Sequence, residues 1–353
     1  MTKQQPSSQV VKGAFGAKNR NRLIDKYFES AGTEFAPAVA WAHVYRLLLW
    51  ADQTTGLAHC YESDKSQPGK NWYARSLAFH DWLSTAISAK PAELANEIDW
   101  LFRHATEDLA AEVLRGATRL AAAASKQLAP YEGRAFPKPG EDPELISIIR
   151  EVLGEHFRSE PTAERWQLLV QRVRQYLSLE NKRKNLVGEG FEDVLSHVIR
   201  RACKLPSLEV FTRRPLHEIP GFNRARRGEK PSKVDVAVIK PAMRTLVTAK
   251  WSVRADREKQ FTTDFSDYVN AESDGKSFEY IFVTNEFDPA RLMRACDKLA
   301  GNTPMFSRVV HLSTEAVRET YSNSDENSMK RVLAFIDSGR LISLETWLSQ
   351  LAQ

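Results

Sequence analysis

The spacing of apolar residues in this chain changes near residue 205, and this change constrains the fold more than any other sequence feature. From residue 20 to residue 127, apolar residues recur at helical spacing, in segments such as IDKYF and AVAWAHVYRLLLWA. After residue 205, short segments rich in β-branched residues follow one another: LEVFTR, KVDVAVI, TLVTAKW, EYIFVT and RVVHLS. Such segments are typical of strands. The sequence therefore predicts a helical first part and an α/β second part.

Helical segments surround these expected strands. We expect helices at about 144–155, 162–179 and 190–203 before the strands, and at about 256–271, 288–299 and 327–337 between them. This alternation favours a mixed sheet flanked by helices. Residues 128–144, rich in proline, glycine and charge, are the expected linker. The predicted organisation is a loose arm over 1–18, an all-helical domain over 19–135 that contacts DNA or dimerises, and an α/β domain over 136–353.

Composition excludes several classes of protein. Of the 353 residues, 42% are hydrophobic and 27% are charged, and no apolar run approaches the roughly 20 residues that a membrane span needs. The N-terminus lacks an apolar signal region, so we expect a cytoplasmic protein. The three cysteines form no CxxC pair and the histidines form no HExxH motif. Any bound metal is therefore expected to have carboxylate ligands.

Positive charge is concentrated in one part of the chain. Between Phe211 and Gln260 there are 13 lysines and arginines against 5 acidic residues, so the rest of the chain carries a net charge of −3 within a total of +5. Lysine and arginine dominate nucleic-acid affinity because they neutralise phosphates. The window predicts a surface that binds a polyanion, although a solvated loop would show the same composition.

Two of the expected strands form the part of the chain where we expect chemistry. KVDVAVI and TLVTAKW, joined by the turn KPAMR, predict a β-hairpin over residues 233–253. In such a hairpin Asp235 can lie beside Lys250, and Thr248 shares the face of Lys250. An ordinary cross-strand ion pair at the end of a sheet would give the same pattern. The hairpin alone therefore leaves a catalytic pair and a structural ion pair open.

The residues around Lys250 resemble the PD-(D/E)XK nuclease superfamily, whose members carry an aspartate on one strand and an acidic-x-lysine pair on the next. Here Thr248 stands at the acidic position. One branch, the Type II restriction endonucleases that recognise CCGG and related sites, has a small residue there and takes its carboxylate from the following helix. Asp264 lies at the matching offset, 14 residues after Lys250, and KWSVRADR contains the Arg-x-Asp-Arg element of this branch.

This resemblance implies metal-dependent hydrolysis of a phosphodiester. Mg²⁺, which prefers oxygen ligands, would be held by three carboxylates, those of Asp235, Asp264 and Glu192. Lys250 would orient the attacking water and offset charge on the phosphate. Asp264 replaces the glutamate of the branch, so Asp267 is its alternative, and Glu189 is the alternative to Glu192. An exposed acid in the first turn of a helix would equally explain Glu192.

The resemblance also implies how DNA is recognised. Arginine can read guanine and a carboxylate can accept from cytosine, so we expect base readout by Arg254, Asp256 and Arg257. An internal Arg-Asp network at the start of a helix is the alternative. The basic residues expected to contact the DNA backbone or outer bases are Arg213, Arg214, Arg224, Arg226, Arg227 and Lys230.

The resulting hypothesis is a Type II restriction endonuclease that cuts double-stranded DNA at a palindrome with a CC/GG core and leaves a 5′-phosphate and a 3′-hydroxyl. The Arg-x-Asp-Arg form favours CCGG over CCNGG. A palindrome implies a homodimer at least, with a tetramer as the larger option. A cognate DNA methyltransferase is expected by analogy. The alternatives are a less specific repair or phage-defence nuclease of the same fold, and a catalytically inactive DNA-binding protein.

Overall fold

The computed structural model describes residues 12–32, 35–52, 56–57, 71–112, 142–223, 232–253, 258–322 and 325–353. Contacts divide the chain into two compact units. The first comprises Met1–Asn19 and Ala105–Asn185, and the second comprises Arg20–His104 and Leu186–Gln353. No described helix is long and apolar enough to cross a membrane.

The described elements are as follows in chain order. The helices include α2 (Ala17–Ser30), α3 (Ala40–Leu48), α4 (Asn71–Ala86), α5 (Leu94–Glu97), α7 (Pro143–Leu153), α8 (Ala163–Ala202), α9 (Glu258–Ala271), α10 (Pro289–Asp297), α11 (Thr314–Tyr321), α12 (Asn327–Asp337) and α13 (Leu344–Leu351). The strands include β1 (Ala51–Asp52), β2 (Gly56–Leu57), β3 (Glu209–Pro215), β4 (Lys233–Lys240), β5 (Met243–Lys250), β6 (Glu279–Thr284), β7 (Leu299–Ala300), β8 (Thr303–Pro304), β9 (Arg308–His311) and β10 (Leu341–Ser343).

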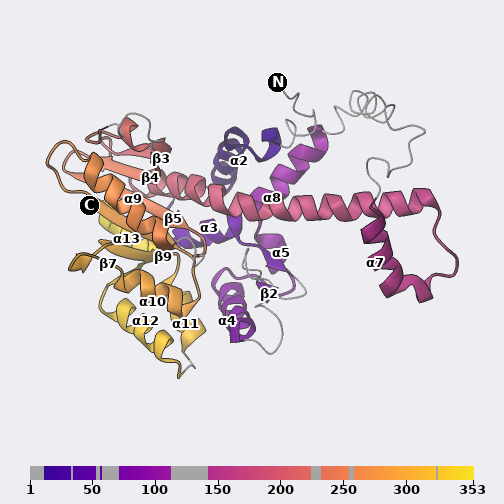
Figure 1. Cartoon of the computed structure of the whole chain (residues 1–353). Helices are drawn as coiled ribbons and strands as arrows, with labels where there is room; N and C mark the ends of the chain where they lie inside the picture. Colours follow the sequence, from indigo (N-terminus) through magenta and orange to yellow (C-terminus); the bar gives the residue numbers. More distant parts are fainter. Residues whose placement is uncertain are drawn as a thin grey trace. The chain divides into compact units, whose positions relative to one another are not determined.

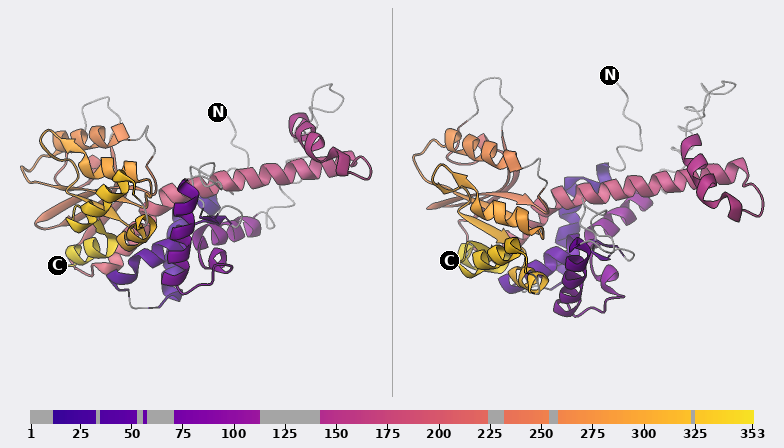
Figure 2. Two further views of the ribbon diagram at one scale, coloured as in Figure 1. Left: turned by 90° about the horizontal axis from the view of Figure 1, so that it is seen from below. Right: turned by 60° about the horizontal axis from the view of Figure 1, so that its bottom comes forward.

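A six-stranded mixed sheet forms the centre of the second unit, with the strand order β10-β9-β6-β5-β4-β3 (Figure 1). Strands β3, β4 and β5 pair antiparallel, whereas β5, β6, β9 and β10 pair parallel. Helices lie against both faces of this sheet (Figure 2). The predicted α/β fold with a mixed sheet flanked by helices is therefore confirmed.

Strands β4 and β5 form the predicted hairpin. Their register pairs Lys240 with Met243 at the turn and Val236 with Val247 further along. The valines and other apolar residues of both strands are buried. This register sets Asp235 opposite Thr248, one position beyond the last pair, so both side chains point to the same face of the sheet.

Aromatic side chains attach α9 to that face. The Phe261 ring lies 5.1 Å from the ring of Phe282 on β6, and the Tyr268 ring lies 5.4 Å from that of Tyr280. Residues 261, 264, 265 and 268 share one side of a helix. Because the rings on this side pack on the sheet, α9 carries Asp264 toward the ends of β4 and β5.

Helix α8 is one continuous helix, whereas the sequence led us to expect two helices separated between residues 179 and 190. This prediction was wrong because Gly188 and Gly190 lie inside the helix. A Cβ atom on Gly190 would meet Leu48 Cδ2 at 3.3 Å and Leu101 Cδ2 at 3.5 Å. Close packing against these leucines therefore offsets the low helix propensity of glycine.

The described part of residues 20–104 is mainly helical, as expected, apart from the two-residue antiparallel strands β1 and β2. It belongs to the same unit as the sheet. Tyr45 Oη on α3 donates to Asn285 Oδ1 at 2.6 Å, and the Phe79 ring of α4 lies 4.6 Å from that of Phe287. The expected boundary at 135/136 and most of the expected linker lie outside the described residues. The separate helical domain stays a prediction.

In the first unit, α7 begins one residue after Asp142, whose side chain accepts a hydrogen bond from the Leu145 backbone N–H at 3.1 Å. This N-cap agrees with the helix expected at about 144–155. Arg174 on α8 also donates to Asp142, at 2.9 Å, which joins the two helices within this unit.

Candidate active site

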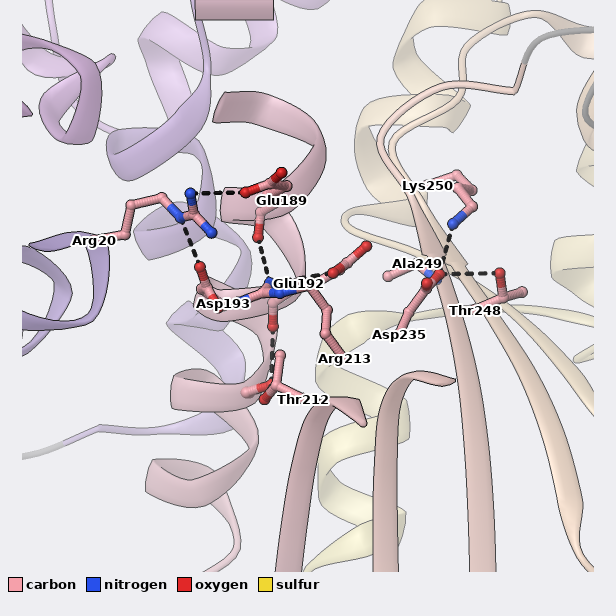
Figure 3. Close-up of polar contacts among 11 residues, drawn as sticks. Arg20, Glu189, Glu192, Asp193, Thr212, Arg213, Asp235, Thr248, Ala249 and Lys250 are labelled. Atoms are coloured by element: carbon pink, nitrogen blue, oxygen red, sulfur yellow. Dashed lines mark hydrogen bonds and ion pairs between the residues drawn. The ribbon is translucent and has the colours of Figure 1, made fainter. Parts of the chain in front are cut away.

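The candidate active site is centred on Asp235, at the end of the β4–β5 hairpin that lies opposite the turn. Asp235 Oδ2 accepts hydrogen bonds from Lys250 Nζ at 2.6 Å, from the Ala249 backbone N–H at 2.9 Å and from Thr248 Oγ1 at 3.2 Å (Figure 3). The Asp235 and Lys250 side chains keep 20% and 23% of their surface exposed. The pair is thus both held in place and reachable from solvent.

Asp264 on α9 contributes a second carboxylate. Burial and the negative charges of Asp235 and Asp267 together raise the pKa of Asp264 to about 6, against the opposing effect of Lys250. Asp267, the alternative acid, instead accepts a hydrogen bond from Ser232 Oγ. Of Asp264 and Asp267, Asp264 is therefore the one that the Asp235–Lys250 pair affects more directly.

Glu192 on α8 contributes a third carboxylate. Burial and the charge of Asp235 raise the pKa of Glu192 to about 8, although Lys250 and Arg213 act in the opposite direction. Its alternative, Glu189, keeps 62% of its side chain exposed and forms an ion pair with Arg20 at 2.8 Å. Glu192 is therefore the acid of α8 that interacts with Asp235. The sequence-based alternative of an exposed helix-end acid does not describe it, because Glu192 is only 9% exposed and lies well inside α8.

Lys250 keeps its positive charge in this setting. Burial alone would lower the pKa of Lys250, but the carboxylates of Asp235, Glu192 and Asp264 more than offset this effect and raise it above the ordinary value. A charged lysine that is partly shielded from water can stabilise negative charge that develops on a bound group.

The three carboxylates suit a divalent cation by their chemistry. Oxygen ligands of this kind are those that Mg²⁺ takes in proteins. Burial and then the charge of Asp235 raise the pKa values of Glu192 and Asp264, so both acids lie near enough to Asp235 to be affected by its charge. Among the described residues, however, no three His, Cys, Asp or Glu side chains already form a cluster that could hold a metal ion. The three carboxylates are ligands of the type that Mg²⁺ takes, but they would have to move closer together to bind one ion.

The remaining predicted residues fall into two groups. Those outside the described residues are Arg224, Arg226, Arg227, Lys230, Arg254, Asp256 and Arg257. Arg214 is exposed and forms an ion pair with Glu218 at 3.2 Å. Arg213 instead donates to Glu192 Oε2 at 3.1 Å and also to Asp193 (Figure 3).

The sequence did not point to two buried acids near the site. Asp193 is 2% exposed and accepts from Arg20 Nε at 2.8 Å. Glu286 has no exposed surface and accepts from the Val253 backbone N–H at 2.6 Å and from the Asp288 backbone N–H at 2.8 Å. Glu286 comes two residues after the expected strand EYIFVT, and this position at the end of a strand could have identified it as a candidate from the sequence. Asp193 had no such signal, since its partner is 173 residues away.

Comparison with known proteins assigns no family to this chain. No family model matches it, and no curated protein matches it. Among solved structures, a complex of the restriction endonuclease PspGI with substrate DNA is similar over 99% of this chain and 93% of that chain, with 13% identity and a TM-score of 0.34. Metal-depleted Ecl18kI in complex with uncleaved, modified DNA is similar over 95% of this chain and 83% of that chain, with 12% identity and a TM-score of 0.27. The geometry of the site therefore carries the functional argument.

Proposed function

We propose that this protein is a Type II restriction endonuclease that cleaves double-stranded DNA at a palindrome with a CC/GG core and uses Mg²⁺. The observation that supports this most is the hydrogen bond from Lys250 Nζ to Asp235 Oδ2 at 2.6 Å. Glu192 and Asp264 lie close enough to Asp235 for its charge to contribute to their raised pKa values. A purely structural ion pair would not require two further acids beside it, because like charges in one place destabilise the fold.

In the proposed reaction, Asp235, Asp264 and Glu192 would hold the cation. When bound, Mg²⁺ would polarise the scissile phosphate and lower the pKa of a water molecule. The Lys250 ammonium group orients the attacking water and stabilises the negative charge that builds up on the phosphate. Asp235 keeps Lys250 in place through their shared hydrogen bond. The products are a 5′-phosphate and a 3′-hydroxyl.

Base recognition is assigned to Arg254, Asp256 and Arg257, which follow Lys250 closely in the sequence. An arginine fork matches guanine, and a carboxylate accepts from cytosine. The preferred core is CCGG, with CCNGG as the variant. A palindromic target calls for a two-fold symmetric homodimer, or a tetramer built from two dimers. Host DNA would then need protection by a cognate methyltransferase.

The test is digestion of phage and plasmid DNA by the full-length protein with and without Mg²⁺, followed by sequencing of the fragment ends. We expect discrete, Mg²⁺-dependent fragments whose ends share one CC/GG palindrome, and no fragments with Lys250→Ala. A surface variant, Lys330→Ala, is the matched control, because Lys330 is exposed on α12 and forms an ion pair with Asp325, which precedes that helix.

Other outcomes would point elsewhere. Fragments without a common end sequence would indicate a less specific nuclease of the same fold. Tight, sequence-specific binding without cleavage would indicate a catalytically inactive DNA-binding protein. Cleavage that persists in Lys250→Ala would contradict the proposed active site.

A further inference from the structure

Arg213 on β3 joins the edge of the sheet to the side of α8 that carries Glu192. Its Nη1 atom donates to Glu192 Oε2 at 3.1 Å and to the Glu189 backbone carbonyl at 3.0 Å, and its Nη2 atom donates to Asp193 Oδ1. One guanidinium group thus binds three acceptors, on Glu189, Glu192 and Asp193, which lie about one turn apart on α8. The planar guanidinium group of arginine presents several donors in a fixed geometry, so it can bind several acceptors at once.

Asp193 anchors this arginine from the interior. Its side chain is 2% exposed, and while Oδ1 accepts from Arg213, Oδ2 accepts from Arg20 Nε at 2.8 Å. Arg20 also forms an ion pair with Glu189 at 2.8 Å. A buried carboxylate shared by two arginines is costly to leave with only one of them. Arg213, which donates to Glu192 through Nη1, is therefore also held in place by Asp193 through Nη2.

The backbone of Arg213 supports the same conclusion. Arg213 has φ = 50°, although Thr212 and Arg214 on either side pair normally with Val236 and Val234 of β4. A left-handed conformation is uncommon for a residue with a side chain and persists where its surroundings hold it. Here the hydrogen bonds from the Arg213 side chain to α8 are part of those surroundings.

We propose that Arg213 is a positioning residue for metal binding: it holds the Glu192 carboxylate toward Asp235, so that both acids can serve one divalent cation. The inference rests on the proposed nuclease function. Figure 3 shows the Glu192 carboxylate between the Arg213 guanidinium and Asp235. Partners that orient a metal ligand contribute strongly to metal affinity. The DNA contact expected for Arg213 from the sequence would require its guanidinium to leave three acceptors.

The experiment compares the full-length protein with Arg213→Ala and Arg213→Lys. Arg331→Ala is the control, because Arg331 is an exposed arginine on α12 that forms an ion pair with Asp297. Three quantities are measured: the Mg²⁺ concentration for half-maximal DNA cleavage, the affinity for Ca²⁺ by calorimetry, and duplex binding in EDTA at several salt concentrations. Ca²⁺ serves as the probe because it takes the same oxygen ligands as Mg²⁺. Circular dichroism confirms that each variant is folded.

We expect Arg213→Ala to raise the required Mg²⁺ concentration and to weaken Ca²⁺ binding by about tenfold, the usual effect of losing such a partner. Arg213→Lys should recover part of both losses, and duplex binding in EDTA should stay as in the unaltered protein. Should Arg213→Ala fail to fold, the Arg213→Lys variant, which keeps the charge but not the fork, still has to show a measurable loss of Ca²⁺ affinity.

Three results would overturn the inference. The first is an unchanged Mg²⁺ concentration for half-maximal cleavage in Arg213→Ala, and the second is tighter Ca²⁺ binding in that variant. The third is weaker duplex binding in EDTA with a lower salt dependence, which would make Arg213 a phosphate contact. If the unaltered protein cuts no DNA, the nuclease proposal fails by itself. The comparison of Ca²⁺ affinities still decides the role of Arg213.

Discussion

Lys250 Nζ and Asp235 Oδ2 lie 2.6 Å apart across the β4–β5 hairpin. The same oxygen accepts from the Ala249 backbone N–H and from Thr248 Oγ1, so three donors on β5 fix one carboxylate of β4. Thr248 is therefore one of the groups that orient Asp235. Glu192 and Asp264 place two further carboxyl groups close enough to Asp235 to be affected by its charge.

Asp235→Asn is expected to abolish cleavage without unfolding the protein. The asparagine side chain can still accept from the Ala249 backbone N–H, but it loses the charge that binds Lys250 and a cation. We expect single-turnover cleavage of plasmid DNA to fall by about a hundredfold or more. Asp337→Asn, on an exposed residue of α12, is the control. Cleavage near the original rate in Asp235→Asn would remove this residue from the site.

Asp264 and Asp267 on α9 should differ in their effect on cleavage. Asp264 responds to the charges of Asp235 and Lys250, whereas Asp267 accepts from Ser232. We therefore expect Asp264→Asn to lower the cleavage rate by about a hundredfold, and Asp267→Asn to have the smaller effect. Cleavage rates at saturating and at low Mg²⁺ are the measurement. The opposite order of losses would make Asp267 the acidic member of the site.

Gly221→Ala should destabilise the fold strongly. Gly221 has φ = 86°, and a Cβ atom there would lie 2.0 Å from Arg244 Nη1, which donates to the Gly221 carbonyl. Arg244 is buried and also binds Glu272 at 2.7 Å. We expect the free energy of unfolding to fall by about 3 kcal/mol or more, against about 1 kcal/mol for Gly339→Ala, which has φ = 70° but open space around it. Equal losses in chemical denaturation would argue against the clash.

Glu286 should make the protein less stable as the pH rises. Burial raises the pKa of Glu286 from the ordinary 4.5 to about 7, against the effect of the Val253 and Asp288 N–H groups. The folded state therefore binds the proton more tightly than the unfolded state does. Its contribution is full below pH 4.5 and is lost as the pH rises through about 7.

Glu286→Gln should remove this pH dependence. Relative to the variant, the unaltered protein should lose up to about 3 kcal/mol of unfolding free energy over that range. Denaturation at pH 4.5, 6 and 8 measures the difference, with Glu319→Gln, on an exposed residue of α11, as the control. A constant difference across the three pH values would contradict the raised pKa.

Much of the sheet was predictable because its signals are local. The β4–β5 hairpin depends on two alternating segments and a short turn, and α12 has the predicted bounds of 327 and 337. Strand β10 was not predicted because only three residues form it, and its pairing with β9 depends on tertiary contact. The continuous α8 was missed for a related reason, since the packing of Gly190 against Leu48 and Leu101 cannot be read from helix propensity.

The sequence by itself determined the neighbourhood of Asp235 and Lys250, because side chains alternate along strands and a short turn sets the register between them. Asp264 was expected from its offset of 14 residues after Lys250, which rests on the family resemblance. Only the tertiary structure decided that Glu192, rather than Glu189, turns toward Asp235, and that Arg213 and Arg20 share Asp193. These contacts join α2, α8 and β3, whose partners lie up to 173 residues apart. Their geometry follows from how the elements pack, and short-range spacing contains no information about that packing.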